Sequence, residues 1–197
     1  MPPRLRLGLL ASGGGSNVQA LIAAVGRGDL EATIAVVIAN NSGCGALQHA
    51  RNADLVARHI SSKTHADEDA ALRAELAAHR VDVVVLAGYM KRIGPQVLSA
   101  YPGRIVNIHP GPLPRFGGRG MFGRRVHEAV LAGGVASSGP TVHLVDEEYD
   151  HGSHLAHRPV PVMADDTPET LAQRVLVAEH DLYWRVIADH FVGRLSR

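Results

Sequence analysis

The sequence predicts an α/β fold: a mostly parallel, twisted sheet with helices on both faces and a C-terminal antiparallel hairpin. Short apolar, β-branched runs alternate with helical patterns through the first half of the chain, at intervals suited to βαβ crossovers. Glycine-rich turns separate several of these units. Near the C-terminus, two strand-like runs flank a short polar connection, which is typical of a hairpin. The 197 residues suit a single domain.

The first unit is a strand, a turn and a helix. Charge and leucine alternate over residues 4–10 before the run turns apolar, which predicts a strand. The segment 11–17 contains three consecutive glycines and predicts the turn. Residues 18–25 have helical spacing, and Gly26 and Gly28 are expected to end that helix.

Further strands and helices alternate up to the middle of the chain. The strands are expected at residues 31–39, 55–60, 83–87 and 105–108, and the helices at 47–52, 66–79 and shortly before Tyr101. The strand at 105–108 is β-branched and apolar apart from one Asn, so it should be buried in a parallel sheet. Pro110 should stop it.

The pattern changes after residue 118. A helix is expected at 126–131, and the hairpin is expected from strands at 140–145 and 154–162. The last helix should start after Thr167, which can cap it, with Pro168 at the first helical position, and should extend to about residue 191.

Composition excludes several classes of function. The net charge is +1, with 46% hydrophobic and 20% charged residues, so no nucleic-acid or membrane partner is indicated. Cys44 is the only cysteine, so no disulfide can form within the chain, which is typical of a cytoplasmic protein. No signal peptide or membrane span is apparent. A monomer or a homodimer is expected.

Asn107 and His109 stand two residues apart at the end of the strand at 105–108. Side chains two apart on a strand project to the same face, so an amide and an imidazole lie side by side. Ligands bind at the carboxyl ends of strands in open α/β sheets. An amide can donate to a developing oxyanion, and an imidazole can exchange a proton near neutral pH. The alternative is two ordinary turn residues.

The glycine-rich turn at 13–17 lies between a strand and a helix, where free backbone amides suit an anion. A dinucleotide site would also need an acid after the next strand, but Asn40 and Asn41 stand there. This favours a simpler phosphate, such as a sugar phosphate, over NAD. A turn without any ligand remains the alternative.

Four carboxylates lie in the hairpin connection. Three of them, Asp146, Glu147 and Glu148, have the pattern of a solvated turn. Asp150 precedes a glycine-containing tip that can turn toward the ligand face. A carboxylate close to His109 would raise the pKa of that imidazole and prepare it to act as an acid.

Four motifs together resemble one family. They are Ser12-Gly-Gly-Gly-Ser16-Asn17, Leu86-Ala-Gly-Tyr-Met90, Asn107-Ile-His109-Pro110 with Leu113-Pro114, and Val142-His143-Leu144-Val145 leading to Tyr149-Asp150. In this order and spacing, over nearly the whole chain, they are similar to the glycinamide ribonucleotide formyltransferases, a family of folate-dependent formyltransferases with a Rossmann-like fold.

The resemblance implies a de novo purine biosynthesis enzyme that transfers the formyl group of 10-formyltetrahydrofolate to glycinamide ribonucleotide, without a metal. The implied catalytic residues are Asn107, His109 and Asp150. The ribonucleotide phosphate and amine would be bound by Gly15, Ser16, Asn17, Val18, Gln19 and Glu179. The folate would contact Met90, Lys91, Arg92, Ile93, Asn107, Asp146, Glu147, Glu148, Tyr149 and Asp150. Residues 1–102 would form the phosphate-binding half, and residues 103–197 the catalytic and folate-binding half.

Glu179 also has support from its own surroundings. It lies at the edge of a helical apolar stripe formed by Leu171, Val175, Ala178, Leu182 and Val186. A charge there is costly without a partner, although a surface acid with its head in water remains the alternative.

The chain departs from the family pattern in three places. Gly111-Pro112 makes a stiffer loop after His109-Pro110, and the segment 119–125 is longer than in many relatives. A basic residue expected near the folate tail has no counterpart among Asp67, Glu68 and Asp69.

Three other functions stay open at this stage. A formyltetrahydrofolate hydrolase could use the same scaffold, and a non-catalytic module could bind only a sugar phosphate. A metal enzyme could use His151, His154 and His157, but the last two would face opposite sides of a strand.

Overall fold

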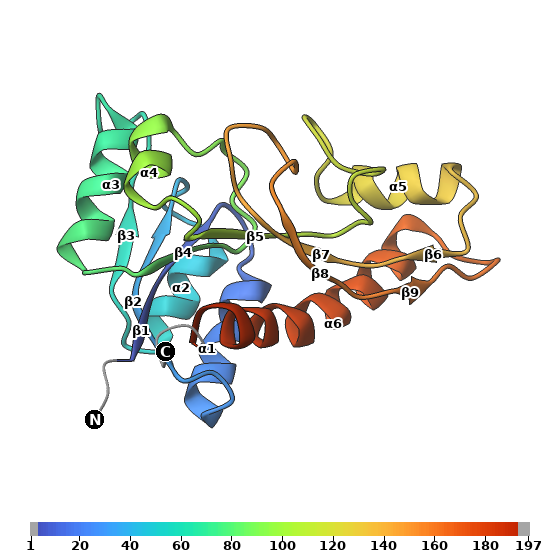
Figure 1. Cartoon of the computed structure of the whole chain (residues 1–197), viewed down its shortest axis with the longest axis horizontal. Helices are drawn as coiled ribbons and strands as arrows, with labels where there is room; N and C mark the ends of the chain where they lie inside the picture. The colour runs from blue at the N-terminus through green and yellow to red at the C-terminus, as the bar shows by residue number, and fades with distance from the viewer. Residues whose placement is uncertain (1–3, 193–197) are drawn as a thin grey trace.

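The computed structural model of the chain describes residues 4–192 and confirms the expected fold (Figure 1). A seven-stranded sheet has the order β3-β2-β1-β4-β5-β7-β8. Its strands are β1 (Leu5–Ala11), β2 (Ala32–Ala39), β3 (Ala57–His59), β4 (Val83–Leu86), β5 (Ile105–His109), β7 (Thr141–Leu144) and β8 (His154–His157). The strands β1 to β5 are parallel, while β7 and β8 form the expected antiparallel hairpin at the β5 edge.

Six helices accompany the sheet within the described range. They are α1 (Ser16–Arg27), α2 (Gly45–Asn52), α3 (Glu68–Ala78), α4 (Pro95–Ala100), α5 (Arg124–Ala132) and α6 (Pro168–Ile187), and α6 continues into a π-helical turn, Ala188–Val192. The expected capping of α6 is confirmed: Thr167 caps the helix and Pro168 is its first residue. Gly28, with φ of 81°, ends α1 as expected, whereas Gly26 lies within the helix.

The two faces of the sheet bury different helices. On one face, leucines of β1 pack against α1, α2 and α6. On the other face, residues of β2 and β4 pack against α3 and α4 (Figure 1). Because both faces are covered, the central strands need apolar residues at nearly every position, and all four residues of β4 are buried. This explains why the apolar runs predict these strands so directly.

The expected single strand at residues 154–162 is wrong. The chain forms β8 and then a separate strand, β9 (Val160–Pro161), which pairs with β6 (Ser137–Ser138), a strand the sequence did not predict. Pro159 lies at the break and has no N–H to donate to a ladder, so the pairing with β7 cannot continue through it.

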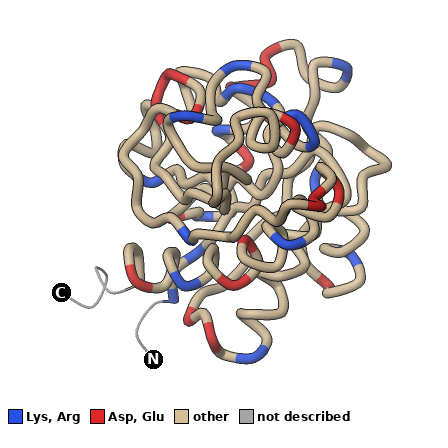
Figure 2. Tube along the Cα trace, turned by 90° about the vertical axis from the view of Figure 1, so that its right-hand side faces the viewer, with Lys and Arg blue, Asp and Glu red and all other residues tan. Residues whose placement is uncertain are grey.

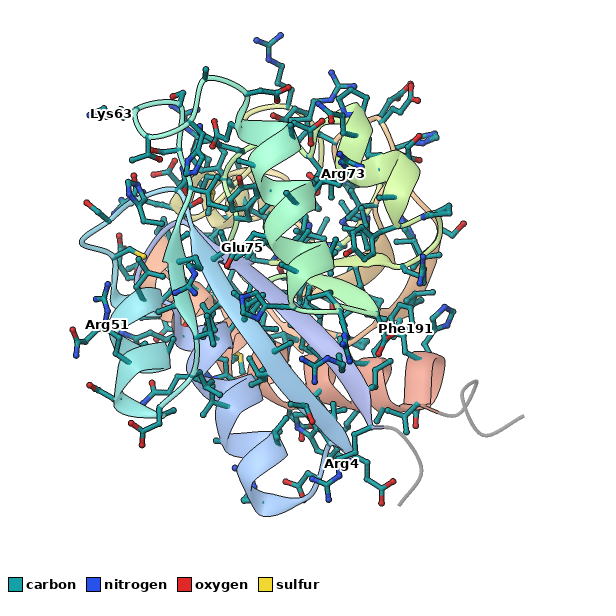
Figure 3. All side chains as sticks on the ribbon, turned by 90° about the vertical axis from the view of Figure 1, so that its left-hand side faces the viewer. Arg4, Arg51, Lys63, Arg73, Glu75 and Phe191 are labelled. Atoms are coloured by element: carbon teal, nitrogen blue, oxygen red, sulfur yellow. The ribbon has the colours of Figure 1, made fainter. Side chains whose placement is uncertain are left out.

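The carboxyl ends of the parallel strands form one rim of the molecule. Figure 3 shows Lys63, which follows β3, at the opposite end of the sheet from Arg4, which precedes β1. On this rim, β1 and β4 are neighbours. From β1 the chain first continues to β2 and β3 on one side of β1, and it then returns to β4 and β5 on the other side. Such a reversal of strand order opens a crevice in α/β sheets.

Helix α6 is tied directly to the strands beside that crevice. The buried hydroxyl of Tyr183 lies within hydrogen-bonding distance of two backbone carbonyls, 2.9 Å from Leu86 in β4 and 3.0 Å from Val106 in β5. The hydroxyl therefore holds the last helix against both strands.

Charged residues of both signs are interspersed along the chain trace (Figure 2). Within residues 4–192, no helix combines the length and the apolar character needed to cross a membrane.

Candidate active site

The carboxylate of Asp150 lies between two buried histidines. Its Oδ2 is 3.4 Å from Nδ1 of His109, and its Oδ1 is 3.5 Å from Nε2 of His143. Both histidine side chains are only 3% exposed. The end of β5 thus meets the strand β7 and the hairpin loop that follows β7 at one carboxylate.

Asn107 and His143 face each other across the β5–β7 ladder, where they are register partners. Nδ1 of His143 lies 2.8 Å from the carbonyl oxygen of Leu144, so that nitrogen carries the proton in the neutral ring. Nε2 is then an acceptor, and it lies 3.0 Å from the amide nitrogen of Asn107. His143 therefore holds one amide N–H of Asn107 and leaves the other to face the cavity.

The protonation of His109 differs from the expectation. Nε2 lies 2.8 Å from the carbonyl oxygen of Phe116, and Nδ1 faces Asp150, so both nitrogens lie near acceptors. Burial nevertheless lowers the pKa of His109 below its ordinary value of 6.5, outweighing the opposing effects of Asp150 and Phe116. Asp150 acts to raise the pKa of His109, as expected, but desolvation of the imidazolium is the larger effect, so the expectation of a protonated His109 is wrong.

Local backbone geometry turns Asp150 inward. Its φ is 55°, a left-handed conformation that is uncommon outside glycine. The N–H of Gly118 donates to its Oδ2 at 2.9 Å. Burial acts to raise the pKa of Asp150, but the neighbouring imidazoles of His143 and His109 and the Gly118 N–H together lower it below its ordinary value of 3.8. The carboxylate is therefore ionised at neutral pH.

A cavity of about 690 Å³ opens over this cluster. Asn107, His109, His143 and Asp150 all line it. One wall comes from the segment after β4 and from the hairpin loop, and it consists of Met90, Lys91, Arg92, Ile93, Val145, Asp146, Glu148 and Tyr149. Met90 is 52% exposed and Tyr149 is 45% exposed, so apolar surface is available to a flat ligand at this end.

Another part of the cavity lining is formed by the start of α1 and by α6. Ser16 and Asn17 begin α1, and Glu179 faces them from α6. The amide of Asn17 donates to Glu179 Oε2 at 2.7 Å, while Asn17 Oδ1 is buried without a partner. Burial raises the pKa of Glu179 to about 7. Glu179 is only 8% exposed, so it is not a surface acid with its head in water.

Four of the expected site residues do not line the cavity. Val18 is fully buried in the core and Gln19 is exposed, because the helical phase of α1 turns both away. The N–H of Gln19 is also already bonded to Gly15. Gly15 precedes α1 with φ of 79° and packs on Ala46. Glu147 points out to solvent from the hairpin loop.

Two histidines in the cavity wall were not predicted as site residues, His143 and His127. A histidine inside a buried strand is a signal for His143, since its two neighbours in β7, Val142 and Leu144, are apolar. His127 follows the buried Val126 on α5, and nothing in the local sequence marks it.

Metal ligation by His151, His154 and His157 has no geometric support among the described residues. Within residues 4–192, no three His, Cys, Asp or Glu side chains are grouped so that they could hold a metal ion. His151 instead pairs with Asp146 at 2.8 Å.

The chain is similar to known formyltransferases. Residues 5–187 match the formyl transferase family model. A phosphoribosylglycinamide formyltransferase of Vigna unguiculata, named as chloroplastic, is 44% identical over 93% of this chain and 60% of its own length. Glycinamide ribonucleotide transformylase 1 of Symbiobacterium toebii superposes with a TM-score of 0.91, at 37% identity over 97% of this chain and 89% of its own.

A different activity is also represented among the relatives. A formyltetrahydrofolate deformylase from Pseudomonas syringae superposes with a TM-score of 0.86 at 27% identity, over 98% of this chain and 63% of its own. The chain spans 60% to 65% of the length of three chloroplastic relatives. With the match over residues 5–187 and this agreement in fold, the chain belongs to the formyl transferase family.

Proposed function

We propose that this protein is a phosphoribosylglycinamide formyltransferase, which transfers the formyl group of 10-formyltetrahydrofolate to the amine of glycinamide ribonucleotide in purine biosynthesis. One observation carries the proposal: the Asn107, His109 and Asp150 cluster opens into the same cavity as the start of α1 and Glu179. Free amides at a helix N-terminus suit the phosphate, and a buried carboxylate suits the amine.

The residues present fit both substrates. Ser16 and Asn17 lie at the phosphate end, and the buried, unpartnered Oδ1 of Asn17 is an acceptor available to a ligand. The exposed apolar surface of Met90 and Tyr149, beside the buried Ile93, suits a pterin. Asp146 and Glu148 add acceptors for its ring N–H groups.

In the proposed reaction, the amine nitrogen bonds to the formyl carbon and the carbonyl electrons move to oxygen. The free amide N–H of Asn107 donates to this oxyanion. Once His109 has taken a proton, its Nε2–H can donate to this oxygen as well, at the position that the Phe116 carbonyl occupies when no ligand is bound. The Asn107 amide does not need to reorient at the moment of reaction, because His143 already holds it, and Asp150 holds Nδ1 of His109.

The intermediate collapses when the bond from the formyl carbon to the folate nitrogen breaks. The attacking amine loses one proton and the folate nitrogen gains one. His109 is mostly neutral at pH 7, so it can accept the first proton, and Asp150 stabilises the imidazolium that forms. The lowered pKa of His109 makes that imidazolium a better acid for the second transfer.

A formyltetrahydrofolate hydrolase remains the second candidate, because the deformylase of Pseudomonas syringae shares the fold. A hydrolase would not need the phosphate end of the cavity. The test measures formate release and formyl transfer by the purified protein, with and without glycinamide ribonucleotide. Transfer that depends on the ribonucleotide supports the proposal, and formate release at equal rates without it would contradict the proposal.

The same proposal assigns functions to the two halves of the chain and includes the protein's oligomeric state and cellular location. We place phosphate binding in residues 1–102 and the chemistry in residues 103–197, with Met90 to Ile93 reaching the folate from the first part. We also propose a cytoplasmic monomer or homodimer, a state that size-exclusion chromatography with light scattering would determine.

A further inference from the structure

His127 is a buried histidine that the mechanism above does not use. It lies on α5, is 4% exposed and lines the cavity. Its Nδ1 is buried and has no hydrogen-bond partner among residues 4–192. Unpartnered polar atoms are rare in protein interiors and call for an explanation.

The burial of Nδ1 determines which nitrogen carries the proton. A proton on Nδ1 would leave an N–H group buried without an acceptor, which is costly. A proton on Nε2 leaves only a lone pair at the buried position. Burial, with a smaller contribution from the charge of His109, lowers the pKa of His127, so the ring is neutral. The neutral ring therefore directs an Nε2–H donor away from the buried nitrogen.

His127 belongs to the wall that α5 shares with α6. Arg124, the first residue of α5, pairs with Glu169 at the start of α6. Val126 and Val130 pack in one cluster with Leu171 and Val175 of α6. Glu179 continues this α6 wall toward α1. His127 is thus on the side of the cavity that holds the phosphate and amine sites, whereas the folate wall comes from the other loops.

We propose that His127 is a substrate-binding residue that donates a hydrogen bond from Nε2 to an oxygen of the ribonucleotide between its phosphate and its amine. This inference rests on the proposed function, because that function supplies the ligand. The ribose hydroxyls and the glycinamide carbonyl are acceptors in this part of the molecule. His127 contributes to ribonucleotide affinity and leaves the folate site unaffected.

The test compares two variants by calorimetric titration with glycinamide ribonucleotide and, separately, with a folate inhibitor. His127→Leu removes the donor, and we expect the ribonucleotide Kd to rise roughly 3- to 10-fold, the factor of one neutral hydrogen bond. His127→Gln keeps an N–H at a similar reach and should restore most of the affinity. The folate Kd should stay unchanged in both variants.

His180→Leu is the matched control. His180 is a half-buried histidine of α6 with an unpartnered Nε2, but it does not line the cavity. Its replacement should leave the ribonucleotide Kd unchanged. Equal ribonucleotide affinity in wild type and His127→Leu would overturn the inference, and so would an equal loss of folate affinity.

One measurement needs no variant. Nitrogen NMR of the wild type should show His127 protonated at Nε2, with a shift that moves when the ribonucleotide is added. A ring protonated at Nδ1 would contradict the proposal. If the wild type bound no ribonucleotide at all, the proposed function would fail first, whereas ribonucleotide binding without any effect of His127 would reject this inference alone.

Discussion

The two polar groups of the cavity are built in opposite ways. At the β5–β7 edge, Asn107, His109, His143 and Asp150 lie close to one another and to backbone partners. At the α1–α6 end, Asn17 Oδ1 has no partner, and burial raises the pKa of Glu179 to about 7. The first cluster is organised before a ligand arrives, whereas the second holds a buried carboxyl at a cost and leaves Asn17 Oδ1 without a partner among the described residues.

The two clusters should therefore contribute to different steps, one to catalysis and the other to ligand binding. Fixed donors lower a reaction barrier because they need no reorganisation when charge develops. Unsatisfied groups destabilise the free protein, and a ligand that pairs with them gains affinity. Changes at the first group should therefore affect turnover, and changes at the second should affect ribonucleotide binding and protein stability.

The largest effect is expected from Asp150→Asn. Loss of the carboxylate removes the partner of the imidazolium, and kcat should fall roughly 10²- to 10⁴-fold, the range for a general acid–base group. The pKa of His109 should fall further, because the charge that opposes desolvation is gone. NMR titration of His109 and single-turnover kinetics measure both effects. A higher pKa of His109 in this variant would contradict the proposed effect of the Asp150 carboxylate on the imidazole.

Asn107→Ala should lower kcat roughly 10²- to 10³-fold, because it removes one oxyanion donor. The KM for the ribonucleotide should change little, since this group acts on the transition state. Steady-state kinetics provide the measurement. Asn52→Ala, at the exposed end of α2, is the control and should have wild-type turnover. Wild-type turnover in Asn107→Ala would argue against the catalytic role proposed for this cluster.

Glu179→Gln should reduce kcat/KM roughly 10- to 100-fold, through loss of a charged acceptor for the amine. The same change should stabilise the protein at alkaline pH. The pKa of Glu179 in the folded state, about 7, lies above its ordinary value of 4.5, so the native state holds this proton more tightly than the unfolded chain. The free energy of unfolding therefore falls as the pH rises from about 4.5 to about 7, by roughly 3 kcal/mol.

Thermal denaturation of wild type and Glu179→Gln at pH 5 and pH 8 measures this linkage. The variant should lack most of the decrease in Tm that the wild type shows at pH 8. If the Tm values of the two proteins depended on pH in the same way, burial would not raise the pKa of Glu179 as expected.

The smallest effects are expected from two glycines of the α1 region. Gly15→Ala places a methyl group 2.5 Å from the Ala46 Cα, at a φ of 79°. It should lower the free energy of unfolding by roughly 1 to 3 kcal/mol and raise the KM for the ribonucleotide. Gly26→Ala lies inside α1 with open space around it and should stabilise the protein by roughly 0.5 to 1 kcal/mol. Chemical denaturation measures the free energy of unfolding of both variants. Equal changes in the two would contradict the predicted steric clash with Ala46 at Gly15.

Much of the fold could be predicted from local patterns. The strands β1, β2, β4 and β5 are apolar runs because the sheet is covered on both faces. The pair β6 and β9 could not be predicted, since strands of two residues are too short to show any periodicity. The end of β8 could not be predicted either, because the sequence does not show that Pro159 would lie beside β7, where it has no N–H to donate.

The site could be predicted only in part. The period of two along β5 places Asn107 and His109 on one face, and both line the cavity. The orienting role of His143 depends on the β5–β7 register, which the sequence does not specify. The lowered pKa of His109 depends on burial by segments distant in the chain, so no local pattern shows it. The roles of individual residues remain predictions until the variants are measured.

Helix α6 has a consequence for the order in which the protein matures. It follows every other element of the cavity along the chain, yet it supplies Glu179 and anchors β4 and β5 through Tyr183. During synthesis on the ribosome, the strands and loops of the cleft emerge before the helix that completes it. A nascent chain that stops before α6 is therefore an unfinished enzyme, and activity should appear only once that helix has left the exit tunnel.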